Sequence, residues 1–168
     1  MARTRSYWLM KSEPDVFSIQ DLAASGATGW DGVRNYQARN YLRDGMKVGD
    51  GVLFYHSSTH PSGISGIAEV VRGGYPDDTA FDTEDVHYDP KSDPAHPTWY
   101  RVDVKFMKAF SSVIPIQTLR KTPGLQGMVL FRNGRLSVQP VSKKEWGIIL
   151  RLAEKTRNPS IPKPKSRR

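Results

Sequence analysis

Two tryptophans, Trp30 and Trp99, occupy positions that suit contact with a flat partner. Trp30 lies in a polar, glycine-flanked turn, and Trp99 follows a proline-containing loop at the start of an alternating apolar pattern. An indole ring can stack on a nucleobase, which contributes roughly 1–3 kcal/mol to binding. An indole can equally cover a hydrophobic core with its N–H hydrogen-bonded. The residues alone leave both interpretations open.

The residue types that catalytic and metal sites require form no recognisable pattern in this chain. The sequence has no cysteine, which excludes a disulfide, a thiolate zinc site, an iron–sulfur cluster and a cysteine nucleophile. His56 and His60 are close in sequence, but Pro61 and the polar residues between the histidines predict a loop without a third ligand. The chain contains no glycine-rich phosphate loop and no complete nucleophile elbow. We therefore expect no catalytic activity, no metal and no cofactor.

The formal net charge of +8 comes from the two ends of the 168-residue chain. Residues 155–168 carry six Lys and Arg and no acid, Arg3 and Arg5 add two positive charges, and residues 6–154 hold 17 bases and 17 acids. We predict a basic N-terminal extension at 1–5, one folded domain at 6–154 and a disordered basic tail at 155–168. The ends can attract phosphates non-specifically, but the composition does not demand a basic face on the domain.

The sequence shows no membrane-length segment. No apolar run reaches the roughly 18 residues of a membrane helix, and the first residues lack the apolar core of a signal peptide. Together with the lack of cysteine, this predicts a cytoplasmic protein with no membrane partner. The sequence does not fix the oligomeric state, and we favour a monomer.

Short elements of both kinds predict an α+β domain built on a small β-barrel with flanking helices. Apolar and alternating patterns predict strands over residues 7–11, 51–56, 65–71, 100–110 and 135–138. Helical patterns cover residues 18–25, 36–44, 116–121 and 142–154. The last helix opens with a capping box formed by Ser142 and Glu145. Asn133 and Gly134 can close a hairpin, or a short helix over 124–131 can end before Gly134, and both alternatives stay open.

A long irregular segment separates two of the predicted strands, at residues 73–97. Seven acids and one lysine fall between Pro76 and Asp93. A long loop inside a compact domain often carries function. A solvated surface excursion explains the same composition.

Eight segments make the chain resemble the EVE domain family. They are YWLMKSEP at 7–14, GWDGVRNYQARN at 29–40, KVGD at 47–50, VLFYHS at 52–57, GIAEV at 66–70, YDPKSD at 88–93, WYRVDV at 99–104 and RLSVQPV at 135–141. The resemblance covers residues 6–154. It implies a PUA-like fold and kinship with YTH domains, which recognise a methylated base in RNA.

The resemblance also implies a nucleic-acid-binding module that reads a modified base, with DNA favoured over RNA, by extruding the base into an aromatic pocket. Lys11, Ser12, Trp30 and Trp99 stand at positions similar to those of the YTH pocket. Glu13 stands where the relative has an amide, and its carboxylate would favour a partner that presents N–H or O–H groups.

We extend this resemblance to a full candidate site. Trp30 and Trp99 would stack on the base. The expected contacts to the base edge come from Lys11, Ser12, Glu13, Asp31 and Asn35. Further wall candidates are Tyr36, Phe54, Tyr55, His56 and Ser57. Phosphates would be met by Arg34, Arg39 and Arg43, whose alternative is a solvated helix face.

Two rival functions remain. The first is a small-molecule or protein-binding module on the same barrel, which the neutral charge of residues 6–154 favours. The second is a hydrolase that acts on modified nucleosides through His56 or Glu13 and a bound water.

Overall fold

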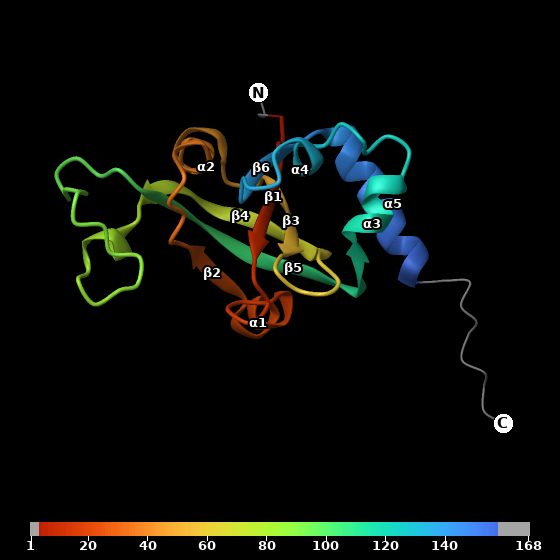
Figure 1. The fold of residues 1–168 in the computed structure, drawn as a ribbon, viewed down its shortest axis with the longest axis horizontal. Coiled ribbons are helices and arrows are strands. Elements are labelled where there is room, and N and C mark those ends of the chain that lie inside the picture. The colour runs from red at the N-terminus through yellow and green to blue at the C-terminus, as the bar shows by residue number, and fades with distance from the viewer. Residues whose placement is uncertain (1–3, 158–168) are drawn as a thin grey trace.

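The computed structural model describes residues 4–157, which form a six-stranded mixed sheet flanked by helices (Figure 1). The strands are β1 (Tyr7–Ser12), β2 (Ala27–Trp30), β3 (Gly51–His56), β4 (Gly63–Pro76), β5 (Tyr100–Pro115) and β6 (Val138–Val141). Their order in the sheet is β2-β5-β4-β3-β1-β6. The β1–β3 pair is parallel and the other pairs are antiparallel. The predicted α+β class is confirmed.

The helices are short apart from the last one. They are α1 (Ile19–Ser25), α2 (Tyr36–Asn40), α3 (Ile116–Lys121), α4 (Val129–Arg132) and α5 (Lys143–Arg157), with a π-helical turn η1 (Tyr41–Gly45) after α2 and a 3₁₀ turn η2 (Asp78–Phe81). Helix α5 continues three residues beyond the boundary expected at 154. The rest of the expected tail, residues 158–168, lies outside the described residues.

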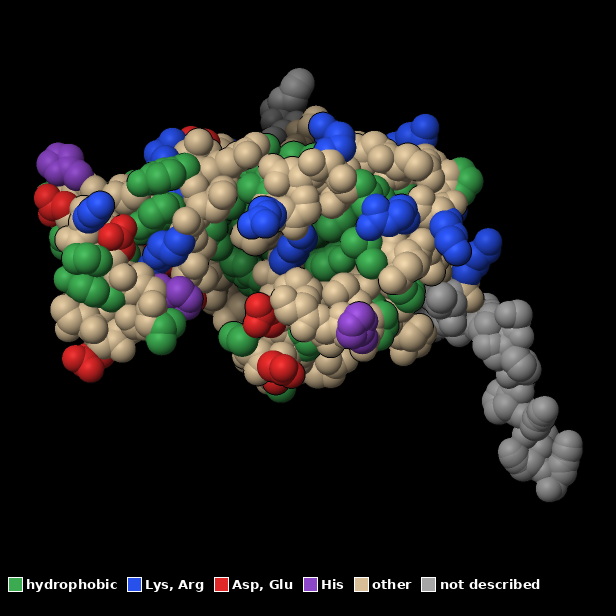
Figure 2. Space-filling view, in the orientation of Figure 1, with side chains coloured by type: hydrophobic (Ala, Val, Ile, Leu, Met, Phe, Trp, Pro, Cys, Tyr) green, Lys and Arg blue, Asp and Glu red, His purple; other side chains and the backbone are tan. Residues whose placement is uncertain are grey.

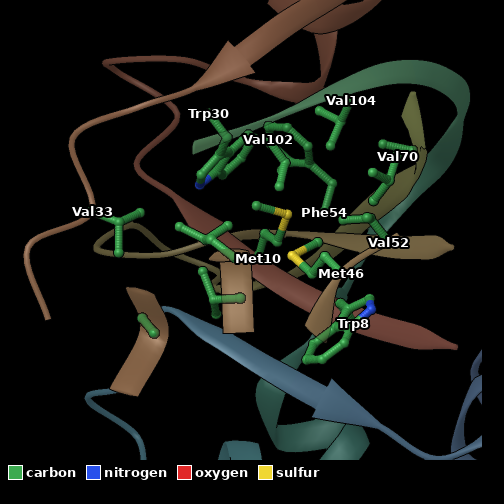
Figure 3. Packing of buried hydrophobic residues seen from close by; sticks show 14 of the residues in the cluster. Trp8, Met10, Trp30, Val33, Met46, Val52, Phe54, Val70, Val102 and Val104 are labelled. Carbon is green, nitrogen blue, oxygen red and sulfur yellow. The ribbon is translucent and has the colours of Figure 1, made fainter. Parts of the chain in front are cut away.

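The central strands β1 and β3 are covered on both faces. Along β1, Trp8 and Met10 belong to one hydrophobic cluster and Leu9 to the other. Helix α1 and the α2–η1 segment pack on the first cluster, which Figure 3 shows around Phe54 and Trp30. Helices α3, α4 and α5 pack on the second. Successive residues of a strand point to opposite faces, so a strand covered on both sides is apolar throughout.

Side-chain caps explain where two helices begin. Ser18 and Asp21 form a capping box at α1. Ser142 accepts a hydrogen bond from the Glu145 amide at 3.0 Å, and the Glu145 carboxylate accepts one from the Ser142 amide at 2.9 Å. These contacts satisfy backbone N–H groups that the first helical turn leaves unpaired. The capping box predicted for the last helix is confirmed.

Two element predictions need correction. The strand expected at 135–138 is wrong, because β6 runs Val138–Val141. Strand β2 was not predicted at all. Of the two alternatives at Asn133–Gly134, the short helix is correct, although it is limited to Val129–Arg132, and these two residues close no hairpin.

A buried carboxylate joins the start of β1 to the turn before β3. Asp50 has no exposed surface and accepts hydrogen bonds from the Ser6 amide at 3.1 Å, the Trp8 indole N–H at 2.9 Å and the Lys47 amide at 2.9 Å. A buried charge is tolerated where donors replace the water it has lost. Asp50 therefore fixes the parallel β1–β3 pair at its first residues.

Replacing Asp50 with Ala should lower the free energy of unfolding by about 2–4 kcal/mol, because each buried donor left without an acceptor costs roughly 1–3 kcal/mol. Urea denaturation measures the change. Asp44→Ala is the matched control, since Asp44 is exposed and pairs only with the neighbouring Arg43. Equal stabilities of the two variants would contradict the structural role of Asp50.

Candidate nucleic-acid interface

A cavity of about 540 Å³ opens where β1 and β2 end. Strands β1 and β2 stand four positions apart in the sheet order, so the sheet curls to bring their carboxyl ends to one site. The lining residues are Lys11, Ser12, Glu13, Val16, Phe17, Thr28, Gly29, Trp30, Asp31, Gly32 and His87. The acidic segment between β4 and β5 (residues 77–99) projects at the left in Figures 1 and 2. Figure 2 shows a hollow between this projecting segment and the body of the domain. Five of the predicted site residues meet here: Lys11, Ser12, Glu13, Trp30 and Asp31.

Trp30 is the large aromatic wall of this cavity. Its ring is 9% exposed and packs edge-on against Phe54, with ring centroids 5.4 Å apart. The indole N–H groups of Trp8 and Trp99 donate to Asp50 and Asp89. The indole N–H of Trp30 has no hydrogen-bond partner among residues 4–157. The buried side-chain nitrogens and oxygens without a partner in the described residues are Arg101 Nε and Gln139 Oε1, so the Trp30 N–H reaches an accessible surface, where a ligand can accept its hydrogen bond.

Polar groups surround Trp30. The Ser12 hydroxyl donates to the Phe17 carbonyl at 2.6 Å, and the Lys11 ammonium donates to the Gly134 carbonyl. Burial lowers the pKa of Lys11. Burial raises the pKa of Asp31, and the Arg101 guanidinium opposes that rise. The cavity thus offers carboxylate acceptors, from Glu13 and Asp31, beside an apolar ring.

Three predicted residues on β3 and just after it do not line this cavity. Tyr55 is 3% exposed and belongs to the second hydrophobic cluster. His56 is buried, and its Nε2 accepts the Ile19 amide N–H at 3.1 Å. The Ser57 amide donates to the Ser12 carbonyl. These residues support the strand ends that carry the cavity.

Trp99 also lies outside the cavity lining. Its ring is 6% exposed, stacks on Tyr36 with centroids 4.9 Å apart, and donates from its N–H to Asp89 at 2.6 Å. Tyr36 is largely exposed on the outer side of this pair. Hence the structure does not bring the two predicted tryptophans to one cavity.

The segment of Asn35 and the three predicted phosphate-binding arginines is engaged in local structure. Asn35 caps α2 through the Ala38 amide. Arg39 donates to the Thr98 carbonyl at 2.6 Å and lies over the Tyr36 ring. Arg43 pairs with Asp44 at 2.8 Å and is partly exposed.

Arg34 anchors the long acidic segment. It donates to the buried Asp77 carboxylate at 2.9 Å, to the His87 carbonyl at 2.7 Å and to the Thr79 hydroxyl at 3.2 Å. Burial alone would raise the pKa of Asp77, but hydrogen bonds from Thr79, Gly32 and Arg34 outweigh burial and leave the pKa lowered. The carboxylate is therefore ionised and holds the segment against the domain.

Sequence reasoning missed His87, which this segment adds to the cavity lining. Gly32 has φ +80°, and a Cβ there would lie 2.6 Å from the His87 ring. Only glycine permits both this conformation and this close approach. The length of the acidic segment was the one sequence signal for such a role.

Nothing in the described part of the chain suggests a metal site or a membrane span. No group of three or more His, Cys, Asp or Glu among residues 4–157 could hold a metal ion. No helix in this range is long and apolar enough to cross a bilayer.

The mixed sheet curls and places a polar cavity, lined by Trp30, at the ends of two strands. This arrangement is typical of a ligand-binding domain. The chain belongs to the EVE domain family, whose sequence profile matches residues 6–152. It is 44% identical to human thymocyte nuclear protein 1 over 169 aligned positions, which cover 89% of this chain and 75% of the relative. The expectation of a non-catalytic binding module agrees with the human relative, which was solved in complex with DNA.

Solved structures share the fold of this chain. A hypothetical protein from Leishmania major superposes with a TM-score of 0.91 at 49% identity, covering 94% of this chain and 100% of that one. Human THYN1 in complex with 5-methylcytosine-containing DNA gives a TM-score of 0.83 at 45% identity, covering 89% and 98%. A YTH domain from Zygosaccharomyces rouxii, solved with N6-methyladenosine RNA, gives 0.52 at 12% identity over 91% and 89%, and shares the fold.

Replacing Arg34 with Gln should release the acidic segment, because removing one partner of a buried ion pair costs roughly 3–5 kcal/mol. Amide hydrogen exchange of residues 78–96 should accelerate by about tenfold or more. Arg43→Gln is the control, since this arginine lies in the nearby η1 turn and pairs with the exposed Asp44. Unchanged exchange in Arg34→Gln would contradict the anchoring role.

His56 should make stability depend on pH. Burial lowers its pKa below the ordinary value of 6.5, since the neutral ring accepts the Ile19 N–H. The unfolded chain then binds the proton at a higher pH than the folded one. Stability is thus full above about pH 6.5 and falls as the pH drops below it.

Urea denaturation of His56→Gln between pH 7 and 5 should show a weaker loss of stability than the unsubstituted protein. His60→Gln, which replaces an exposed histidine in the following loop, should keep the full loss. The same pH dependence in all three proteins would refute this role of His56.

Proposed function

We propose that this domain binds DNA and reads a modified base, with a modified cytosine favoured, after the base has left the helix and entered the cavity beside Trp30. The observation that carries the proposal is the cavity itself: one buried indole with an unpaired N–H, next to two carboxylates. The complex of human THYN1 with 5-methylcytosine-containing DNA supports DNA as the partner and cytosine as the base.

The energetics are consistent with this assignment. Extruding a base costs a few kcal/mol, and stacking on one aromatic ring returns roughly 1–3 kcal/mol. Trp30 alone therefore offsets only part of the cost. The remainder has to come from hydrogen bonds to the base edge and from contacts to the DNA backbone.

The polar lining suits the edge of cytosine. The exocyclic amino group of cytosine donates hydrogen bonds, and Asp or Glu carboxylates are its typical acceptors. Glu13 and Asp31 supply such acceptors at the cavity. Val16 and Phe17 add apolar surface for a methyl group, which is worth about 1–3 kcal/mol in an apolar pocket.

The cellular compartment of this domain can be inferred from the location of the DNA that it is proposed to bind. The vertebrate relatives carry the name thymocyte nuclear protein 1. In a cell without a nucleus the DNA lies in the cytoplasm, which is the location expected from the sequence. We assign the domain to whichever compartment holds the DNA that it reads.

Trp30→Ala should weaken binding to a duplex with one 5-methylcytosine by about 5- to 150-fold, the equivalent of losing 1–3 kcal/mol of stacking. Fluorescence anisotropy measures the dissociation constant. Tyr36→Ala is the control, because Tyr36 is exposed and outside the cavity lining. Equal affinities of both variants would refute the stacking role of Trp30.

Glu13→Gln and Asp31→Asn test the base edge without touching the core. Both should weaken binding to the methylated and the plain duplex alike, because the exocyclic amino group is present in both bases, while circular dichroism melting stays unchanged. Unchanged affinity for both duplexes would contradict the proposed contacts to the base edge. A free modified nucleoside that binds as tightly as the duplex would instead favour a small-molecule-binding module.

A further inference from the structure

The charges of residues 6–154 are unevenly distributed, because one long stretch contains basic residues and no acidic ones. Residues 104–144 contain eight Lys and Arg and no Asp or Glu. All eight basic side chains are exposed, and none forms an ion pair with a described residue. By contrast, Arg34, Arg43 and Arg101 in the earlier part of the chain each face an acid.

The fold brings part of this stretch to the rim of the cavity. Lys11 lines the cavity, and its ammonium donates to the carbonyl of Gly134, the neighbour of Arg135. The Lys11 amide also donates to the Ser137 carbonyl at 3.0 Å. The loop between α4 and β6 therefore lies directly beside the cavity wall.

The basic side chains continue from this loop onto α3 and α4. The Lys11 ammonium lies 5.6 Å from the centre of the Tyr55 ring. Tyr55 and Leu119, the residue before Arg120, belong to the same hydrophobic cluster. Arg120 stands over the Phe131 ring at 4.8 Å, next to Arg132.

Figure 2 agrees with this arrangement. Lys and Arg side chains gather over the region that α3, α4 and α5 occupy in Figure 1, while most acidic side chains in view lie over α1 and the projecting segment. We call Lys11, Arg120, Arg132 and Arg135 the basic strip.

We propose that the basic strip binds the phosphate backbone of the DNA strand that flanks the extruded base. This inference rests on the proposed function and names the path of the DNA away from the cavity. Arg120, Arg132 and Arg135 are exposed and form no ion pair with a described residue, so they can release counterions from the duplex at no cost in broken ion pairs. Arg34 lacks this property, because its donors are held by the acidic segment. Lys11 is partly buried and joins the strip at the rim of the cavity.

Binding of the full-length double variant Arg132→Gln/Arg135→Gln to methylated and plain duplexes tests the proposal. The slope of log Kd against log salt concentration should fall by about 2, because each phosphate contact contributes about 0.9. Affinity for both duplexes should drop by the same factor, since phosphate contacts carry no base information.

The matched control is Lys105→Gln/Lys108→Gln, which removes two exposed and unpaired lysines of β5 that do not line the cavity. The control should keep the slope of the unsubstituted protein. Equal slopes for the two double variants would overturn the proposal. So would a change in the ratio between methylated and plain DNA in the strip variant alone, because the strip would then contact the base.

Two further outcomes separate this inference from the proposed function. If the unsubstituted protein does not prefer methylated DNA but the strip variant still loses salt dependence, base reading fails and the phosphate path stands. Tighter, strip-dependent binding to a single-stranded RNA of the same sequence would overturn DNA as the occupant.

Discussion

The ion pair between Arg34 and Asp77 is the contact on which the site depends. Asp77 has no exposed surface, and its carboxylate accepts hydrogen bonds from the Gly32 amide at 2.8 Å, from Arg34 and from Thr79. One carboxylate thereby joins the segment after β2 to the start of the acidic segment. Because the Arg34 guanidinium also holds the His87 carbonyl, the same contact sets the position of a cavity wall. A buried pair of this kind is costly to break from either side.

Most of the fold follows from local patterns in the sequence. The strands over 7–11 and 51–56 are indicated by apolar runs, and the capping box of the last helix by two side chains three residues apart, and the structure contains all of them. Strand β2 could not be predicted, because the four residues Ala27–Trp30 carry no alternating pattern and pair only with the distant β5. The shift of β6 to Val138–Val141 has the same cause, since its register is set by β1.

Site residues at strand ends could be predicted from the sequence. Site residues whose position depends on the irregular acidic segment could not. Lys11, Ser12 and Glu13 follow one another at the end of β1, and Trp30 and Asp31 at the end of β2, and these strand ends bring the five residues to one cavity. The position of Trp99 depends on Asp89, and that of Arg34 on Asp77. Both acids belong to an irregular segment whose course no periodic pattern indicates. The resemblance implied that Trp30 and Trp99 stack on the same base, and the structure separates them, since only Trp30 lines the cavity.

The separation of charge along the molecule gives the domain an electric dipole. The acidic segment projects at one end of the domain in Figure 1, and α3 and α5 lie at the other. In the electric field of a polyanion a domain with such a dipole experiences a torque as well as an attraction. The domain is therefore oriented before it contacts the polyanion. A domain whose residues 6–154 are neutral overall can therefore approach a polyanion in one preferred orientation, and salt would randomise that orientation before it abolished contact.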